Sequence, residues 1–198
     1  AEFNAALIER LDGEGYVYFM RSGYRGSPAN STLFWLGDQM VTWDEQDGIK
    51  TAVMGLLTGG ISGFALNHSD IGGYTTITNP LGSYHRSREL LFRWMELNAF
   101  SVVFRTHEGN QPENNAQFYT DAESLAQFAR MAKLYAAWDF YRRDLIDIAA
   151  NRGLPVVRPM FLVFEDDLQV YSIRYEQFMV GEELLIAPVL DPGVTQVS

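Results

Sequence analysis

The sequence predicts a parallel α/β fold, and three observations support this. Strand-like segments alternate with helix-like ones, the strands are short and apolar, and a polar cluster follows three of them: RSGYRG, NHSDIGGY and RTHEGN. Alternating strands and helices favour a parallel sheet, and short apolar strands suit a sheet covered on both faces, either a barrel or a doubly wound sheet. Because the carboxyl ends of the strands of a (β/α)₈ TIM barrel converge on one active site, the polar clusters favour the barrel.

The first strand and helix are predicted between residues 16 and 60. Residues 16–20 are aromatic and β-branched, which is typical of a strand. Thr42 and Glu45, three residues apart, form a capping box that predicts a helix start. Gly59 and Gly60 are expected to end that helix. Its apolar residues fall on one helical face: Ile49, Val53, Leu56 and Leu57.

The next predicted strands are residues 61–66 and residues 101–104, both short and apolar. A helix is expected between them at residues 86–99. Its buried side is predicted from the helical spacing of four apolar residues: Leu90, Leu91, Trp94 and Leu97.

A long helix is predicted from a second capping box, Thr120 with Glu123, to about residue 151. Gly153 then serves as its C-terminal glycine. Residues 154–164 are apolar and are expected to form a fourth strand of the same kind.

The domain organisation follows from counting these units. Four strand–helix units make half of a (β/α)₈ barrel, and a free half would expose two sheet edges, which proteins avoid. We therefore expect a piece of a larger enzyme. Residues 178–190 have no helix partner and indicate another β-rich module. The predicted division is residues 1–170 for the barrel half and residues 171–198 for the start of a C-terminal β-domain.

Composition narrows the classes of partner. The formal net charge is −10, with only 15 basic side chains. Nucleic acid is a poor partner for such a chain, because phosphates are bound by clustered Lys and Arg. No apolar run approaches a membrane span and no signal peptide is evident, so no membrane insertion is expected. The lack of cysteine excludes disulfides and thiolate metal sites and fits a cytoplasmic protein. Neither a cofactor nor a metal is predicted.

Asp38 is the first candidate for catalysis, since it lies between Trp35 and Trp43 in an apparent loop, residues 31–46. A carboxylate among aromatic rings is partly desolvated, which raises its pKa and suits a general acid, and aromatic rings can stack on sugars. Asp38 could equally help to cap a helix at Thr42, with the two tryptophans as a corner of the core. Spacing alone leaves both interpretations open.

Asp70 ends the second predicted strand and precedes Gly72 and Gly73, where the backbone must turn tightly. Its carboxylate could bind substrate hydroxyls, act as a base or only form an Asx-turn. Tyr74 follows these glycines, and its hydroxyl could reach a substrate or its ring could simply pack.

Two further strand ends carry polar candidates. His107 follows Arg105 at the third strand end, where an imidazole could donate to a hydroxyl and a guanidinium could orient a carboxylate. Arg21, at the first strand end, could bind an anion or pair with an acidic side chain.

A metal site is the weaker interpretation of the histidines. His68 with Asp70, or His107 with Glu108, could supply two ligands, but no further His lies at ligand spacing. The residues alone therefore favour a carbohydrate-active barrel, with Asp38 and Asp70 as its catalytic pair.

The ordered motifs add a resemblance to a family. They run RSG, FWLGD, SDIGGY, RTH, PVVRP and FMVGEELLIAPV, from about Tyr16 to Leu190. This order resembles glycoside hydrolase family 31, which contains retaining α-glucosidases, α-xylosidases and sulfoquinovosidases on a (β/α)₈ barrel. SDIGGY, with Tyr74 where α-glucosidases usually have Phe, is similar to the bacterial sulfoquinovosidases.

The resemblance replaces the catalytic pair predicted from the residues. It implies that Asp38 is the general acid/base, because WLGD matches the motif that carries it. It implies that Asp70 and His107 bind sugar hydroxyls, so that Asp70 is not the nucleophile.

The same resemblance implies roles for four more residues. Arg21 and Trp35 match residues that contact the sugar, and Arg105 matches the Arg beside the family's His. Tyr74 matches a tyrosine that helps to recognise the sulfonate of sulfoquinovosides.

The family's nucleophilic Asp has no counterpart here, since it lies on the fourth barrel strand. The resemblance thus implies that the chain holds about strands five to eight and begins after the nucleophile. The function expected is part of a retaining α-glycosidase that hydrolyses α-sulfoquinovosides, such as sulfoquinovosyl glycerol or diacylglycerol, to sulfoquinovose. The isolated chain is expected to be inactive. The alternatives are an α-glucosidase or α-xylosidase, or a non-catalytic carbohydrate-binding fragment. The partner is a small-molecule glycoside, and a homo-oligomer of the parent enzyme is left open.

Overall fold

The computed structural model describes residues 1–11, 15–80 and 82–197. A parallel sheet of three short strands has the order β1 (Phe19–Met20), β2 (Leu33–Trp35) and β3 (Asn67–His68). A single parallel bridge between Ile71 and Thr106 brings the next segment alongside. The parallel α/β class predicted from the sequence is confirmed.

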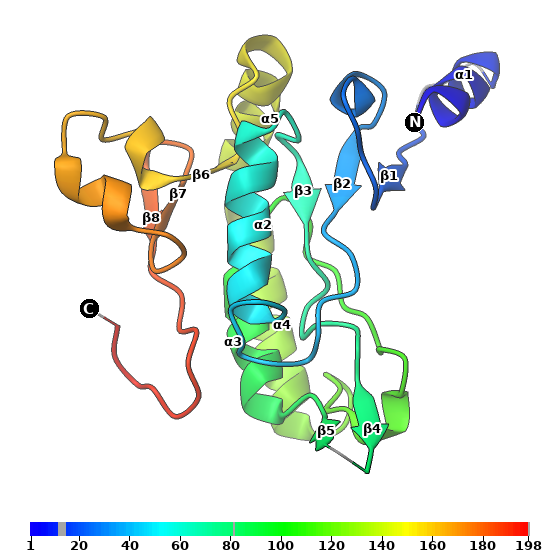
Figure 1. Cartoon of the computed structure of the whole chain (residues 1–198), viewed down its shortest axis with the longest axis vertical. Coiled ribbons are helices and arrows are strands. Elements are labelled where there is room, and N and C mark those ends of the chain that lie inside the picture. The colour runs from blue at the N-terminus through cyan, green and yellow to red at the C-terminus, as the bar shows by residue number, and fades with distance from the viewer. Residues whose placement is uncertain (12–14, 81, 198) are drawn as a thin grey trace.

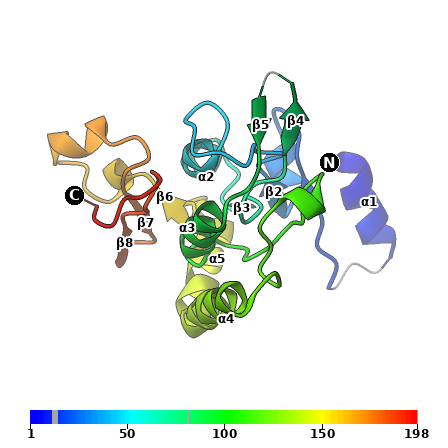
Figure 2. The same cartoon turned by 90° about the horizontal axis from the view of Figure 1, so that it is seen from below.

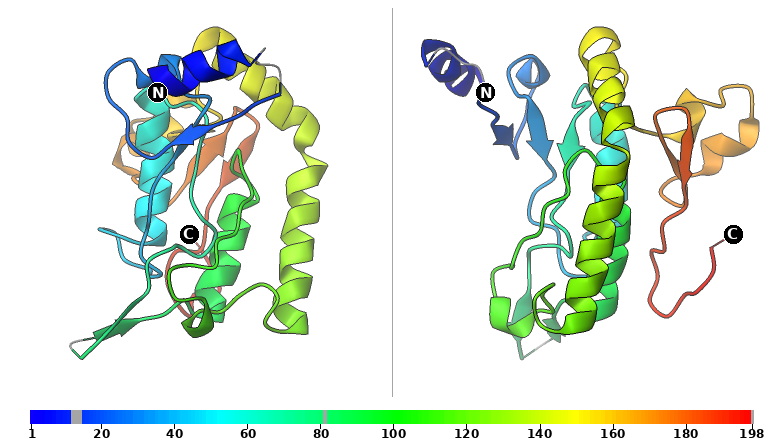
Figure 3. Two further views of the ribbon diagram at one scale, coloured as in Figure 1. Left: turned by 90° about the vertical axis from the view of Figure 1, so that its right-hand side faces the viewer. Right: turned by 180° about the vertical axis from the view of Figure 1, so that it is seen from behind.

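Helices α2 (Ile49–Ile61), α3 (Arg88–Asn98), α4 (Ala122–Ala137) and α5 (Asp139–Arg152) lie on one side of this sheet. A second, antiparallel sheet contains β6 (Val157–Arg158), β7 (Phe178–Val180) and β8 (Leu184–Ile186). The helices stand between the two sheets (Figures 1 and 3). The face of the parallel sheet turned away from these four helices, and the carboxyl ends of its strands, remain available to a site.

The remaining elements lie at the periphery. Helix α1 (Glu2–Arg10) has no buried residue and lies beyond β2 on the side away from β6–β8 (Figure 2). A hairpin of β4 (Ile77–Asn79) and β5 (Gly82–Tyr84) projects from the segment after β3. No helix in the described part of the chain is long and apolar enough to cross a membrane. The described residues also contain four short 3₁₀ helices: Ser27–Ala29, Pro112–Asn114, Met160–Leu162 and Leu168–Ser172.

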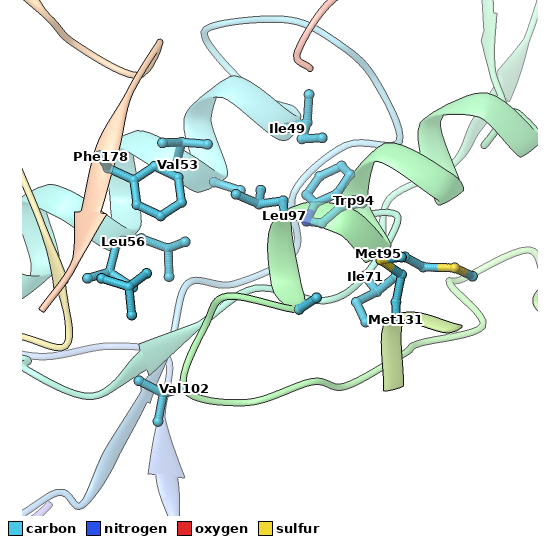
Figure 4. Close-up of a cluster of buried hydrophobic side chains, with 14 of the residues drawn as sticks. Ile49, Val53, Leu56, Ile71, Trp94, Met95, Leu97, Val102, Met131 and Phe178 are labelled. Carbon is cyan, nitrogen blue, oxygen red and sulfur yellow. The ribbon is translucent and has the colours of Figure 1, made fainter. Parts of the chain in front are cut away.

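The core forms where α2 and α3 pack together and meet β7, as the side chains of Val53, Trp94 and Phe178 show (Figure 4). Trp94 is fully buried, and its indole N–H donates to the Ser69 hydroxyl at 3.0 Å. Asn98 of α3 donates to the Ser69 carbonyl oxygen at 2.8 Å. Helix α3 therefore holds the residue that directly precedes Asp70. The predicted helix at residues 86–99 and its buried side are confirmed.

Both predicted capping boxes are wrong. Helix α2 begins at Ile49 without a side-chain cap, and the Thr42 hydroxyl instead donates to the Asp47 carbonyl oxygen in the preceding turn, at 2.6 Å. Helix α4 is capped by the Asp121 carboxylate, which accepts from the Ser124 amide at 2.8 Å. A neighbouring carboxylate is a good acceptor for the free amides of the first turn, so it takes the position expected for the hydroxyl of the preceding Thr.

The strand predicted at residues 61–66 begins later, because α2 continues through Gly59 and Gly60 to Ile61. A Cβ on Gly60 would lie 2.8 Å from Pro155 Cβ, and a Cβ on Gly59 would lie 2.8 Å from Asn67 Nδ2. The glycines thus permit close packing of the helix rather than ending it.

One strand was missed and another was assigned to the wrong sheet. Strand β2 lies within the stretch predicted as a loop, residues 31–46. Of residues 154–164, only β6 is a strand, and it pairs antiparallel with β7. Residues 101–104 form no ladder, because the Ser101 hydroxyl bonds to two nearby carbonyl oxygens in a bend. The described residues do contain four parallel segments, as predicted, but β2 takes the place of the fourth predicted strand, residues 154–164.

The long helix predicted over residues 120–151 is interrupted at Trp138. This residue is buried, and its indole N–H donates to the Ala99 carbonyl oxygen at 2.8 Å. The predicted C-terminal glycine is confirmed, since Gly153 follows α5 with φ of 72°. The hairpin β7–β8 forms within residues 178–190, where a β-element was expected. The domain boundary at residue 170 stays a prediction.

Candidate active site

Three strands of the parallel sheet end in the predicted site residues. Arg21 directly follows β1, and Asp38 and Asp70 lie shortly after β2 and β3. Since the strands are parallel, these ends lie at the same edge of the sheet (Figure 1). The sheet therefore brings together residues that are almost fifty positions apart in the chain.

Arg21 and Asp38 form an exposed ion pair, with 3.1 Å between Arg21 Nη1 and Asp38 Oδ2. Their side chains are 58% and 34% exposed. The Arg21 guanidinium also lies over the Trp35 ring, 5.4 Å from its centroid. Gly37 has a φ of 94°, which lets the chain turn sharply after β2 and presents Asp38 to solvent.

The interpretation of Asp38 as a helix cap is wrong, because α2 begins eleven residues later, at Ile49, and Asp38 contacts Arg21 instead. The two tryptophans also differ in place. Trp43 packs against the hydrophobic core, whereas the Trp35 ring carries Arg21 and Arg105 on it. Trp43 is thus a corner of the core and Trp35 belongs to the site.

Asp70 and Arg105 form the second ion pair, and it is buried. The Asp70 side chain is 0% exposed and Arg105 is 31% exposed. Burial raises the pKa of Asp70, while the positive charge of Arg105 acts in the opposite direction. The turn after Asp70 is closed by its backbone, with the Gly73 amide donating to the Asp70 carbonyl oxygen at 3.0 Å. The carboxylate pairs with Arg105 rather than forming an Asx-turn.

Two buried polar atoms of this group have no hydrogen-bond partner among the described residues, Asp70 Oδ2 and Trp35 Nε1. The indole N–H nevertheless lies near enough to lower the pKa of Asp70. Buried polar atoms are rarely left unbonded in proteins. An acceptor and a donor without partners are what a polyhydroxylated ligand could satisfy.

Tyr74 and His107 form a second aromatic pair, edge to face, with ring centroids 4.8 Å apart. His107 Nδ1 accepts from the Gly109 amide at 3.0 Å. A neutral imidazole that accepts at Nδ1 carries its proton on Nε2, so His107 can donate from Nε2 to a ligand. The loop after Asp70 is also joined to the loop that carries Asp38, because the Tyr74 and Thr75 amides donate to the Gln39 carbonyl oxygen at 2.8 and 2.9 Å.

His68 was considered only as a metal ligand, and the structure places it under the site. Its side chain is fully buried, and the Phe19 ring lies edge to face with it at 5.3 Å. Burial, and then the positive charge of Arg105, lower the pKa of His68 to about 4. The sequence signal was its position two residues before Asp70. In the described part of the chain, no group of three or more His, Asp or Glu could hold a metal ion.

The predicted site residues thus gather as two neighbouring groups. Trp35 joins the two ion pairs, and Tyr74 and His107 follow Asp70 and Arg105 on two chain segments that are joined by the parallel bridge between Ile71 and Thr106. The roles of these residues in catalysis and binding stay predictions. Chemically, the group offers one exposed and one buried carboxylate, two guanidinium groups and an aromatic wall.

Comparison with known proteins identifies the family. The model of the family 31 glycosyl hydrolase TIM-barrel domain matches residues 2–137, and that of the family 31 C-terminal domain matches residues 153–198. The chain is 45% identical to a sulfoquinovosidase of Escherichia coli over 98% of its length and 43% identical to one of Agrobacterium fabrum over 100%.

A solved structure agrees with these matches. A sulfoquinovosidase from E. rectale, in complex with an aza-sugar inhibitor, is 37% identical, with a TM-score of 0.90 over 96% of this chain. The chain spans 28%, 29% and 28% of the E. coli, A. fabrum and E. rectale proteins, respectively. The parallel sheet is therefore part of a TIM-barrel domain, and the chain belongs to glycoside hydrolase family 31.

Proposed function

We propose that this chain supplies the acid/base part of a retaining α-glycosidase that hydrolyses α-sulfoquinovosides. The observation that carries the proposal is the pair of unlike carboxylates at neighbouring strand ends. Asp38 is partly exposed on Arg21, whereas Asp70 is buried on Arg105. The similarity to three sulfoquinovosidases supports the choice of sugar.

Asp38 is the proton carrier in this proposal. In a retaining glycosidase one carboxylate attacks the anomeric carbon while the acid protonates the leaving oxygen, and the two groups lie about 5–5.5 Å apart. Asp38 first gives its proton to the departing glycerol or glyceride oxygen. It then takes a proton from the water that hydrolyses the glycosyl-enzyme. A partly exposed side chain suits both steps, because the leaving group and the water must reach it.

Asp70 and His107 bind sugar hydroxyls in this proposal. Asp70 Oδ2 lacks a partner among the described residues and can accept, and His107 Nε2 can donate. These bonds accelerate the reaction to the extent that they strengthen as the ring flattens toward an oxocarbenium-like state. Arg105 holds Asp70 in place, and Trp35 forms the wall beside it.

The remaining part of the proposal concerns the nucleophile. We place it on the fourth barrel strand, N-terminal to residue 1, so that the parallel segments here are strands five to eight. The isolated chain is then expected to bind but not to hydrolyse glycosides, and saturable turnover by it would contradict this assignment. A cytoplasmic location is proposed from the lack of cysteine.

The test is hydrolysis of matched nitrophenyl α-sulfoquinovoside and α-glucoside by the full-length protein, meaning this chain together with the nucleophile-bearing half. We expect a strong preference for the sulfonated sugar. Tyr74→Phe should lower kcat/KM on that sugar by roughly 10-fold or more, because a hydrogen bond to a charged group contributes about 1.5–3 kcal/mol, and should leave the glucoside rate nearly unchanged.

Tyr84→Phe is the matched control, since Tyr84 is exposed on the β5 hairpin and should lose no activity on either sugar. A preference for the glucoside, with no selective loss in Tyr74→Phe, would retain the retaining mechanism and point to an α-glucosidase or α-xylosidase instead.

A further inference from the structure

Arg86 lies between β5 and α3 and has no part in the chemistry proposed above. It is 2% exposed, yet it forms no ion pair with a described Asp or Glu. A buried charge is costly unless every donor finds an acceptor. Burial lowers the pKa of Arg86 to about 10, so the guanidinium stays charged at neutral pH. The buried N–H groups of the Arg86 guanidinium therefore need hydrogen-bond acceptors nearby.

Four of its six acceptors are backbone carbonyl oxygens of the two loops that carry the candidate site. Nη1 donates to Gly73 at 3.1 Å, in the loop of Asp70 and Tyr74. The same nitrogen donates to the carbonyl oxygen of His107 at 2.9 Å, in the other loop. One planar group therefore joins both loops. The remaining acceptors are Ile71 O at 3.4 Å, Glu108 O at 3.3 Å, Ala116 O at 2.8 Å and Gln117 Oε1 at 2.7 Å.

Gly72 shows how closely the guanidinium stem passes the loop. Its φ is 88°, and a Cβ on it would overlap Arg86 Cδ. Glycine is therefore required at position 72 for two reasons: its positive φ, and the space that Arg86 occupies. This close approach explains why Arg86 can reach carbonyl oxygens on both sides of the turn.

Arg86 is itself held by a second layer of amide side chains. Asn115 Oδ1 accepts from the Arg86 amide at 2.9 Å and from the Thr76 hydroxyl at 2.8 Å. Gln117 accepts from the guanidinium and donates through Nε2 to the Glu108 carbonyl oxygen at 2.9 Å. The guanidinium therefore sits in a fixed polar network rather than in a loose contact.

We propose that Arg86 is a positioning residue that sets the spacing of the Asp70–Tyr74 loop and the His107 loop, so that groups from both reach one sugar together. The inference rests on the proposed function and deepens it. Lysine is a poor replacement, because one ammonium nitrogen has three donors and no planar fork to bridge acceptors on two loops.

The test compares Arg86→Lys with Arg158→Lys in the full-length enzyme. Arg158 is an equally buried arginine, also 2% exposed, that donates to Pro155 O at 2.8 Å and Glu182 Oε1 at 3.1 Å in the other sheet. We expect the two substitutions to lower the melting temperature by similar amounts. Only Arg86→Lys should lower kcat/KM on nitrophenyl α-sulfoquinovoside by 10-fold or more, with most of the loss in KM. Equal kcat/KM for the two variants would overturn the proposal.

A second measurement separates this proposal from the function on which it rests. The amides of Tyr74, Gly109 and Asn110 donate to Gln39 O, His107 Nδ1 and Tyr74 O, respectively, and their hydrogen exchange should quicken in Arg86→Lys and not in Arg158→Lys. Unchanged exchange would overturn the positioning role. Wild-type enzyme that hydrolyses no α-glycoside would contradict the proposed function alone, and the exchange data would still decide the role of Arg86.

Discussion

Two Arg–Asp pairs lie at neighbouring strand ends and use the same chemistry in opposite surroundings. Arg21 and Asp38 meet at the surface, with 58% and 34% of their side chains exposed. In the other pair Asp70 is fully buried and Arg105 is 31% exposed. Both guanidinium groups lie over the Trp35 ring, with Arg21 5.4 Å and Arg105 5.6 Å from its centroid. The pairs therefore differ in solvent access rather than in residue type.

In the proposed function, this difference suits the two carboxylates to separate tasks. A proton carrier must be reached by water and by a leaving group, which the exposed pair permits, and an exposed ion pair contributes little to stability. A hydroxyl acceptor must be held still, and burial against Arg105 does this at the cost of desolvation, which appears as the raised pKa of Asp70.

The largest expected effect comes from removing the exposed carboxylate in the full-length enzyme. Asp38→Asn should lower turnover of substrates with poor leaving groups by about 10³-fold, because general acid catalysis contributes about 10²–10⁴-fold. Activated nitrophenyl substrates should lose less in the glycosylation step. Asp70→Asn should instead impair all leaving groups alike. Steady-state rates on a leaving-group series test this, and the same dependence in both variants would remove the distinction between the carboxylates.

The next effect is on stability and comes from His68, which lies under the buried pair. Unfolded His68 binds a proton near pH 6.5, and the folded residue does so only near pH 4. Between these values the unfolded chain holds more protons, so the free energy of unfolding falls as the pH falls, by about 3 kcal/mol at pH 4.

His68→Leu should remove this part of the pH dependence while leaving stability near pH 8 almost unchanged, since neither ring nitrogen has a partner among the described residues. Urea unfolding of both proteins between pH 4 and pH 8 measures the difference. Parallel curves would show that His68 titrates normally in the folded state.

The smallest effect is expected at the exposed pair. Arg21→Gln should change the free energy of unfolding by less than about 1 kcal/mol, because exposed ion pairs are weak. Arg105→Gln is the comparison, and it should cost more, since it leaves the buried Asp70 without its cation. Thermal unfolding of both variants at low and high salt tests this. Equal losses would mean that burial does not separate the two pairs.

Much of the site could be predicted from the sequence, because its signals are local. The polar clusters after the strands, the helix at residues 86–99 and the helix end at Gly153 follow from short patterns. The parallel order then follows from the alternation of strands and helices. For Arg21 the sequence left two interpretations open, an anion site and pairing with an acidic side chain, and the structure shows the pairing, with Asp38.

Other features depend on contacts that no short pattern contains. Strand β2 has only three residues and is recognisable through its ladder with β1 and β3. Strand β6 resembles the parallel strands in composition, yet it pairs antiparallel with β7. The glycines of α2 resemble a helix stop, but Pro155 and Asn67, distant in the chain, occupy the space beside them.

The sequence by itself determined the α/β class, the helices with strong periodicity and the set of polar residues at the strand ends. Only the tertiary structure decided which Asp is exposed, that His68 lies beneath the site, and that Arg86 ties two loops together. The reason is physical. Periodicity and turns depend on residues a few positions apart, whereas solvent exposure, charge pairing and hydrogen bonds to distant carbonyl oxygens arise when remote segments pack.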